Sequence, residues 1–150
     1  MIYIAHRGNV NGQHSEFENS PMYVADAIER GFDVEIDVWM KNDAWWLGHD
    51  NPTHAIDANF LLHDRVWCHA KDLDALQALL SIGAHCFWHQ NDDVTLTSSG
   101  YMWTYPGIAL TEKSICVMPE RANYTHSELA SAAGVCSDDI ISIKNVMENL

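Results

Sequence analysis

The sequence predicts a single α/β domain, residues 1–150, built on a mostly parallel β-sheet. Short apolar runs alternate along the chain with segments that have the apolar spacing and the capping residues of helices. The connections between them are short, as in β–α–β units. The apolar runs are nearly continuous, which is typical of parallel strands that are buried on both faces. A polar side chain inside such a strand is costly unless it has a use, so these positions are the functional candidates.

The first half of the chain is expected to form four strands and one helix. The strands are expected at residues 1–5, 32–40, 45–48 and 66–70. Ser20 followed by Pro21 predicts a helix start, because Ser is a favoured N-cap and Pro is favoured in the first turn. Gly31 predicts the end of this helix. The Asn-Asp pair at 42–43 predicts a turn between the second and third strands.

The second half of the chain is expected to add three helices and four strands. Asp72 caps a helix that ends at Gly83. Thr125 and Glu128 have the spacing of a capping box before a short helix, and a final helix is expected over residues 140–150. The strands are expected at residues 85–89, 101–105, 114–118 and 135–137.

Composition and charge exclude several classes of partner. A net charge of −13 with only eight Lys and Arg residues disfavours binding to nucleic acids or to anionic membranes. No apolar run approaches the ~20 residues that a membrane span needs. The N-terminus lacks the pattern of a signal peptide, so we expect a cytoplasmic protein. The four cysteines form no CxxC pair, which disfavours a zinc knuckle and predicts free, buried thiols.

Glu35 and Asp37 are the most informative polar residues. They stand two positions apart in a predicted strand, so both carboxylates project from the same face. Two buried carboxylates on one face repel each other and lose hydration. A divalent cation would offset both costs, and hard oxygen ligands suit Mg²⁺ or Ca²⁺. The alternative is that both residues lie on a solvent-facing surface of the sheet.

Two histidines follow predicted strand ends. His6 ends the first strand and His49 follows the short third one. In parallel β/α folds, catalytic groups come from the carboxyl ends of the strands. Histidine titrates near neutral pH, so one ring could act as a base and the other as an acid. Arg7 could bind a phosphate through two parallel hydrogen bonds. For either histidine taken alone, a structural role is the alternative.

Five polar segments stand in order within the first fifty residues: His6-Arg7-Gly8, Glu18-Asn19-Ser20, Glu35-Ile36-Asp37-Val38, Lys41-Asn42-Asp43 and His49-Asp50. Their order and spacing resemble the N-terminal signature of the glycerophosphodiester phosphodiesterases. The resemblance implies a TIM-barrel-like parallel (β/α) barrel, a divalent cation and a small-molecule phosphodiester substrate that paired histidines hydrolyse.

The resemblance also implies a role for each matched residue. His6 and His49 match the acid–base pair of the family, and Glu35 and Asp37 match two of its metal ligands. Arg7 matches the arginine that contacts the phosphate. Glu18 and Asn19 match polar residues that line the same site.

Past residue 50 the resemblance is carried by fewer residues. The segment 67–71 resembles a third-strand block that supplies a metal-ligating Glu and a Lys near the phosphate. Lys71 matches the Lys, but His69 stands at the ligand position. An imidazole ligand would favour a softer ion such as Mn²⁺ or Zn²⁺. The segment 134–138 resembles the closing block of the family.

The chain is also shorter than the ~250 residues of a typical TIM barrel. We therefore expect a shortened barrel with trimmed helices that could lack one βα unit. An incomplete barrel leaves sheet edges that a second copy could cover as a homodimer.

Other residues have weaker signals. His89, Asp92 and Glu120 could reach the site from its rim, and one indole of the Trp45-Trp46 pair could stack on a substrate. The expected function is metal-dependent hydrolysis of a phosphodiester. The alternatives are a phospholipase-type lyase that forms a cyclic phosphate, and a non-catalytic binder of phosphorylated ligands. Glycerophosphocholine, glycerophosphoethanolamine, a nucleotide-linked diester and a sugar diester all remain open as substrates.

Overall fold

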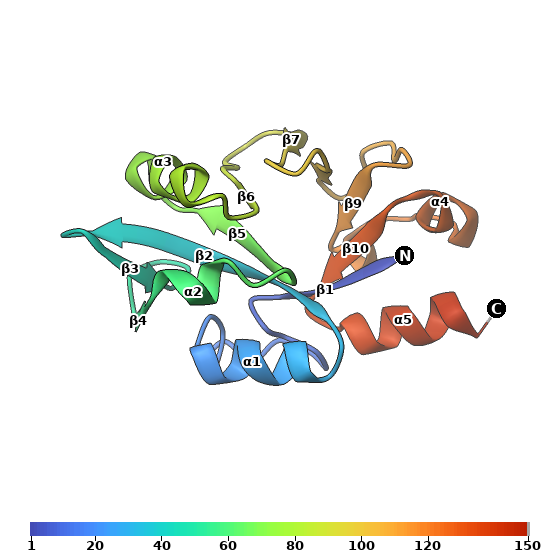
Figure 1. The fold of residues 1–150 in the computed structure, drawn as a ribbon. Helices are drawn as coiled ribbons and strands as arrows, with labels where there is room; N and C mark the ends of the chain where they lie inside the picture. The colour runs from blue at the N-terminus through green and yellow to red at the C-terminus, as the bar shows by residue number, and fades with distance from the viewer. Residues whose placement is uncertain (150) are drawn as a thin grey trace.

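The computed structural model describes residues 1–149 and shows a mixed α/β fold with a curled sheet that forms a partial barrel (Figure 1). The ten strands of the described residues are β1 (Ile2–His6), β2 (Asp33–Lys41), β3 (Ala44–Leu47), β4 (His54–Ile56), β5 (Val66–Ala70), β6 (Cys86–Phe87), β7 (Val94–Leu96), β8 (Met102–Thr104), β9 (Ser114–Val117) and β10 (Gly134–Ser137). The helices are α1 (Pro21–Glu29), α2 (Ala58–Leu61), α3 (Leu73–Ile82), α4 (His126–Ser131) and α5 (Ile140–Glu148), with a 3₁₀ turn at Pro119–Arg121.

Seven strands run parallel in the order β6-β5-β2-β1-β10-β9-β8. The predicted parallel sheet is therefore confirmed. β2 is the longest strand and acts as the spine. Its first half pairs with β1, its second half pairs with the antiparallel strand β3, and its other edge pairs with β5. β4 extends β3, and β7 adds an antiparallel strand beside β8.

The predicted caps and turns form as expected. Ser20 caps α1 by accepting a hydrogen bond from Tyr23 N. Asp72 caps α3, and Gly83 ends that helix in the left-handed conformation. Both members of the capping box are in place at the start of α4. In Figure 1, α1 and α2 lie below β2, α3 lies above β5, and α4 and α5 lie at the side of the sheet near the two termini.

Two hydrophobic clusters stabilise the curled sheet. The outer cluster joins strand residues such as Val34 and Ile36 to α1, α2, α3 and α5. The inner cluster consists mostly of strand side chains, among them Ile4, Trp67 and Trp103. Alternate residues of each strand thus pack to opposite sides, as strand geometry requires. The four cysteines are buried and free, as the sequence predicted.

The partial barrel has a seam between β6 and the hairpin of β7 and β8. In the described residues no strand pairing crosses it. Ser98 bridges the seam, because its N–H donates to Cys86 O (2.8 Å) and its Oγ accepts from Cys86 N (2.9 Å). Inside, the rings of Phe87 and Trp103 meet with centroids 4.6 Å apart.

The structure differs from the sequence predictions in two strands that are shorter than expected and in three short elements that were not predicted. The strand expected at 85–89 ends at Phe87, because the residues that follow leave the sheet and line a cavity. The strand expected at 101–105 is confined to Met102–Thr104. The short elements β4, α2 and β7 were not predicted. The final helix ends at Glu148, and Leu150 lies outside the described residues.

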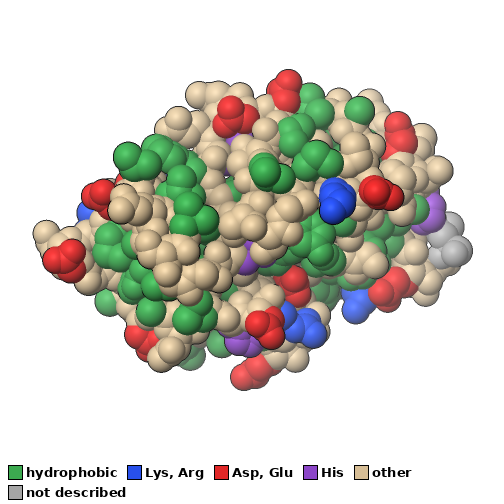
Figure 2. All heavy atoms as spheres, turned by 45° about the horizontal axis from the view of Figure 1, so that its top comes forward, with side chains coloured by type: hydrophobic (Ala, Val, Ile, Leu, Met, Phe, Trp, Pro, Cys, Tyr) green, Lys and Arg blue, Asp and Glu red, His purple; other side chains and the backbone are tan. Residues whose placement is uncertain are grey.

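No helix in residues 1–149 has the length and apolar character needed to cross a lipid bilayer. On the face drawn in Figure 2, acidic side chains are spread widely and basic ones are few, in keeping with the net charge of −13.

Candidate metal and phosphate site

A cavity of about 350 Å³ lies at the carboxyl ends of the parallel strands. Residues from β1, β2, β5, β8 and β9, and from the segments after β3 and β6, line it. The lining residues are His6, Arg7, Glu35, His49, His69, Ala70, Lys71, Trp88, His89, Gln90, Trp103, Tyr105 and Val117. Six of the nine residues predicted for the site are among them.

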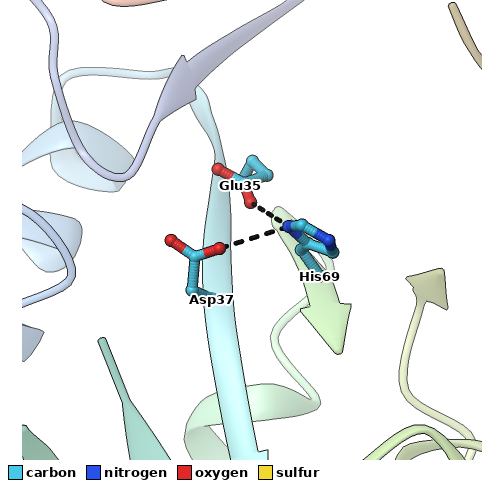
Figure 3. Close-up of side chains that lie close together, drawn as sticks. All are labelled: Glu35, Asp37 and His69. Carbon is cyan, nitrogen blue, oxygen red and sulfur yellow. Dashed lines mark ion pairs between the residues drawn. The ribbon is translucent and has the colours of Figure 1, made fainter. Parts of the chain in front are cut away.

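Glu35, Asp37 and His69 form a compact cluster that could hold a metal ion. Each offers one ligand atom, and these atoms all lie within 4.8 Å of one another. Glu35 and Asp37 project from the same face of β2, and His69 reaches them from β5, where it is the register partner of Asp37. His69 Nδ1 is 3.2 Å from Asp37 Oδ1 and 3.7 Å from Glu35 Oε1 (Figure 3). The prediction of one shared face is confirmed, and the alternative of a solvent-facing pair is wrong.

A hydrogen bond and a ring-stacking contact fix the orientation of His69. Its Nε2 lies 3.0 Å from the backbone oxygen of His89, and a carbonyl oxygen can only accept, so Nε2 donates. The ring also stacks on Phe87 with centroids 5.2 Å apart. The remaining nitrogen, Nδ1, therefore faces the two carboxylates. It needs either a proton or a cation between it and them, and a backbone hydrogen bond of this kind is typical of metal-ligating histidines.

The carboxylates fit the same interpretation. Both are almost completely buried, with Glu35 2% and Asp37 0% exposed. Among the described residues, Glu35 Oε2 and Asp37 Oδ1 have no hydrogen-bond donor. Burial and the neighbouring charge of Asp37 raise the pKa of Glu35. Asp37 Oδ1 lies beside His69 Nδ1, and Glu35 Oε2 lies 3.8 Å from His6 Nε2. A divalent cation bound by the two carboxylates and His69 would offset the cost of these buried oxygens.

The other oxygen of Asp37 is held by the loop after β1. Arg7 Nε lies 3.0 Å from Asp37 Oδ2, and Asn19 Nδ2 donates to the same oxygen at 2.9 Å. Asn19 Oδ1 accepts from Asp37 N at 2.8 Å. Burial alone would raise the pKa of Asp37, but His69, Arg7 and Lys71 outweigh it and lower that pKa.

This loop adopts an unusual backbone to bring its side chains in. Arg7 and Asn19 both have positive φ, 53° and 61°. Arg7 N donates to Glu35 O at 2.8 Å, and Asn19 N donates to Arg7 O at 3.0 Å. Left-handed conformations in non-glycine residues cost free energy and often mark functional positions. Here the two residues with positive φ are the ones whose side chains contact Asp37 Oδ2.

His6 has its own acidic partner. Its Nδ1 is 2.7 Å from Asp138 Oδ1, and its Nε2 is 3.8 Å from Glu35 Oε2. Asn9 donates to Asp138 Oδ1 at 2.8 Å and to Glu18 Oε1 at 2.9 Å. Burial alone would lower the pKa of His6, but the hydrogen bond to Asp138 and the charge of Glu35 raise it.

Asp138 and Asn9 were not predicted as site residues. Asp138 belongs to the segment that resembles the closing block of the family, which is the one signal in the sequence that could have identified it. Asn9 is fully buried, and its position after His6 is the corresponding signal.

The two predicted cations border the cavity. Lys71 Nζ is 3.5 Å from Asp37 Oδ1, and Lys71 N donates to Val38 O at 2.8 Å. Arg7 Nη1 is 3.2 Å from Glu18 Oε2. Of the predicted residues, Glu18 and Asn19 do not line this cavity; they contact Arg7 and Asp37 and line a neighbouring hollow that shares Arg7 and His49 with it.

His49 lines the same cavity but stands at its rim. Its side chain is 42% exposed, and its Nδ1 is 2.8 Å from Asp50 Oδ1. The loop before it is anchored to β2, because Gly48 N donates to Asp37 O (3.1 Å) and Gly48 O accepts from Trp39 Nε1 (2.6 Å). In the described part of the chain, the contacts of the His49 ring with ionisable groups are limited to Asp50.

Of the candidates expected at the rim of the site, one lines the cavity and the others do not. His89 lines the cavity, whereas Asp92 is 60% exposed and lies 3.9 Å from His89 Nδ1. Glu120 accepts from Ser137 Oγ at 3.0 Å and is not a lining residue. Trp45 packs against the outer core.

Comparison of the chain with protein-family models, with curated proteins and with solved structures finds no match in any of the three.

Proposed function

We propose that this protein is a metal-dependent phosphodiester hydrolase of the glycerophosphodiester phosphodiesterase type. The observation that carries the proposal is the Glu35–Asp37–His69 cluster, in which both carboxylates are buried. Glu35 and His69 line one cavity with His6 and with the cations Arg7 and Lys71. Metal ligands, an imidazole and phosphate-binding cations in one cavity are the parts that this reaction needs.

The fold supports the proposal at a coarser level. Seven adjacent parallel strands form a curled sheet, and the cavity lies at their carboxyl ends. A complete TIM barrel has eight such strands and carries its active site at that end. We therefore interpret the fold as a shortened (β/α) barrel that lacks one parallel strand and several helices.

Arg7 and Lys71 would bind the phosphate. Both side chains are largely buried at the cavity, with 16% and 17% exposed. A protein with a net charge of −13 repels an anionic substrate at long range, so cations placed inside the cavity must supply the local attraction. A guanidinium can hold two phosphoryl oxygens at once, and an ammonium acts as a point charge.

Glu35, Asp37 and His69 would hold the metal ion. When bound, a divalent cation at these ligands would polarise the phosphoryl oxygens. Two carboxylates suit Mg²⁺ or Ca²⁺, but the imidazole favours Mn²⁺ or Zn²⁺.

His6 and His49 would move the protons. One ring removes a proton from the nucleophile, which is water or a neighbouring hydroxyl of the substrate. The nucleophile bonds to phosphorus and the ester P–O bond breaks. The other ring gives its proton to the departing alkoxide. A substrate hydroxyl as nucleophile would give a cyclic phosphate first, and ³¹P NMR of the products distinguishes the two routes.

The test of the acid–base pair is the hydrolysis of a glycerophosphodiester by His6→Ala and His49→Ala. We expect each variant to lose about 10²–10⁴-fold in kcat, the usual range for a positioned acid or base. His126→Ala, at an exposed position at the start of α4, is the matched control and should retain full activity. Full activity in either site variant would contradict the assignment.

The test of the metal site uses binding, independent of turnover. We expect calorimetric titration of the protein to give tighter binding of Mn²⁺ or Zn²⁺ than of Mg²⁺ or Ca²⁺. The variant His69→Glu introduces a third carboxylate and should shift this preference by about tenfold towards Mg²⁺ and Ca²⁺. A preference that is identical in both proteins would exclude His69 as a ligand.

A further inference from the structure

One end of the cavity differs in chemistry from the metal cluster. It is formed by Trp88, His89, Gln90, Trp103 and Tyr105, which we call the aromatic wall. Three of these residues follow β6 directly, where the chain leaves the sheet, and the other two come from β8 and its end. The hydrolysis outlined above uses the backbone oxygen of His89 but none of the five side chains, so the wall calls for a separate explanation.

His89 is the unusual member of the wall. It is only 8% exposed, and among the described residues its Nε2 is buried without a hydrogen-bond partner. Its Nδ1 has nearby groups, with Thr95 Oγ1 at 3.4 Å and Asp92 Oδ2 at 3.9 Å. A buried ring nitrogen without a partner is costly, and a ligand group in the adjoining cavity would remove that cost.

The neighbouring side chains supply flat surfaces and an amide. The rings of His89 and Tyr105 have centroids 4.2 Å apart, and Tyr105 is 37% exposed. Trp103 is 4% exposed and rests on Phe87, so its position is fixed by packing. Gln90 adds a side-chain amide that can both donate and accept.

We propose that the aromatic wall binds a planar, nucleobase-like ring carried by one alcohol of the phosphodiester. The ring would stack on the wall, and His89 Nε2 and the Gln90 amide would hydrogen-bond its edge. This inference rests on the proposed function, because it names the substrate class for the same cavity. Aromatic stacking combined with edge hydrogen bonds is how proteins bind unpaired bases.

Two other groups fit the wall less well. A quaternary ammonium gains from aromatic faces but has no hydrogen bond to offer His89 or Gln90. An alkyl chain would bury both polar groups without a partner. A planar heterocycle uses the rings and the polar groups together.

A second hollow indicates which alcohol of the diester would lie on each side of the phosphate. It has a volume of about 520 Å³, and it shares Arg7 and His49 with the first cavity. Its other lining residues are mainly polar and include three acidic residues as well as neutral ones: Glu16, Glu18, Asp50, Gln13, Asn51 and Thr53. A phosphate at Arg7 would thus lie between an aromatic end and a polar end, so the second alcohol of the diester should be a small polyol.

The experiment compares two diesters that share one alcohol, the glycerol esters of thymidine 5′-phosphate and of methyl phosphate. We expect the thymidine ester to have a kcat/KM about tenfold higher. In His89→Phe, which keeps a ring but removes its nitrogens, this ratio should fall to about two. Tyr105→Leu should lower the ratio as well, and its partly exposed position makes it the second variant if His89→Phe does not fold. His126→Phe, at an exposed position, is the control and should keep both rates.

Equal kcat/KM values for the two diesters in the unmodified protein would overturn the inference and leave the proposed function standing. If neither diester is hydrolysed, the proposed function fails, and tryptophan-fluorescence titration with thymidine 5′-monophosphate decides the subsite. Binding that weakens in His89→Phe would support the aromatic wall as a nucleobase subsite. Absence of binding would overturn it.

Discussion

Asp138 orients the ring of His6 from the side opposite the metal cluster. The two atoms in contact, Asp138 Oδ1 and His6 Nδ1, are 2.7 Å apart, and Asn9 holds the same oxygen at 2.8 Å. A carboxylate in this position favours the protonated ring and fixes which nitrogen faces the substrate. In the proposed reaction, Asp138 would therefore act through His6 as a positioning residue.

Asp138→Asn should lower kcat by about 10–100-fold with little change in KM, because the ring of His6 loses its orientation. Removal of the negative charge should also lower the pKa of His6, which NMR titration of the ring measures directly. Asp139→Asn is the neighbouring control, since Asn caps α5 as well as Asp does. If Asp138→Asn left both kcat and the His6 titration unchanged, the positioning role would be wrong.

Residue spacing predicted part of this site and could not predict the rest. Period two in a strand placed Glu35 and Asp37 on one face, and the structure has them there. The pairing of His6 with Asp138 joins residues 132 positions apart. Such a contact follows from the pairing of β1 with β10, and no local pattern encodes it. The rim position of His49 depends in the same way on how β3 packs beside β2.

At the scale of elements, the long strand β2 organises the site. It carries two metal-ligand candidates and anchors the loop before His49 through Asp37 O and Trp39 Nε1. Gly48 is the pivot of that loop, with φ 152°. A Cβ at this position would lie 1.9 Å from Asn51 O, so no side chain fits without a movement of the loop.

Gly48→Ala should destabilise the fold by about 1–3 kcal/mol and reduce kcat/KM, because the loop that carries His49 must move. Gly100→Ala is the matched control. Gly100 also has positive φ, 84°, but a Cβ there would meet nothing within 4 Å. Chemical denaturation and kinetics of the two variants separate backbone strain from the clash. Equal losses in both would show that the Gly48 loop has no special role.

We expect His85, which lies beside the seam, to make the stability of the fold depend on pH. Its ring lies 4.1 Å from that of Trp67, its Nε2 is 2.9 Å from Thr97 Oγ1, and burial lowers its pKa to about 4. The unfolded chain binds this proton near pH 6.5. Protons therefore favour unfolding, and the contribution of His85 is present above pH 6.5 and lost as the pH falls towards about 4.

Thermal unfolding between these pH values provides the measurement. The Tm of the unmodified protein should fall more steeply on acidification than that of His85→Gln, which cannot take up the proton. His63→Gln, at an exposed position, should behave like the unmodified protein. Parallel curves for the unmodified protein and His85→Gln would contradict the expectation.

The elements that the sequence predicted are those with strong local signals. Asp72 and Gly83 delimit α3, and the capping box marks α4. β4 and β7 have three residues each, and all of these residues are partly or fully exposed. They form only because a neighbouring strand offers its edge, which a local pattern does not reveal.

At the scale of the whole molecule, the net charge would oppose the entry of the proposed anionic substrate. The net charge is −13, whereas the cations that would bind phosphate lie inside the cavity. Beyond the Debye length of roughly 10 Å at 0.1 M salt, an approaching phosphodiester responds mainly to the net charge.

We therefore expect kcat/KM for an anionic diester to rise several-fold between about 0.02 M and about 0.2 M KCl, at saturating metal ion. The value of kcat should change little over the same range, because it does not depend on encounter. A decrease of kcat/KM with salt would mean that Arg7 and Lys71 already govern the approach of the substrate.

The seam lies between β6 and the hairpin of β7 and β8, which are the two ends of one continuous run of strand pairings. The metal-ligand candidates lie on β2 and β5, inside the continuous run of parallel pairings. Three residues of the aromatic wall follow β6 at the border of that run, where Ser98 makes the bridging hydrogen bonds. Separation at the seam would leave every strand pairing intact. In the proposed enzyme, widening at the seam would make room for a bulky group while the metal-ligand candidates on β2 and β5 keep their spacing.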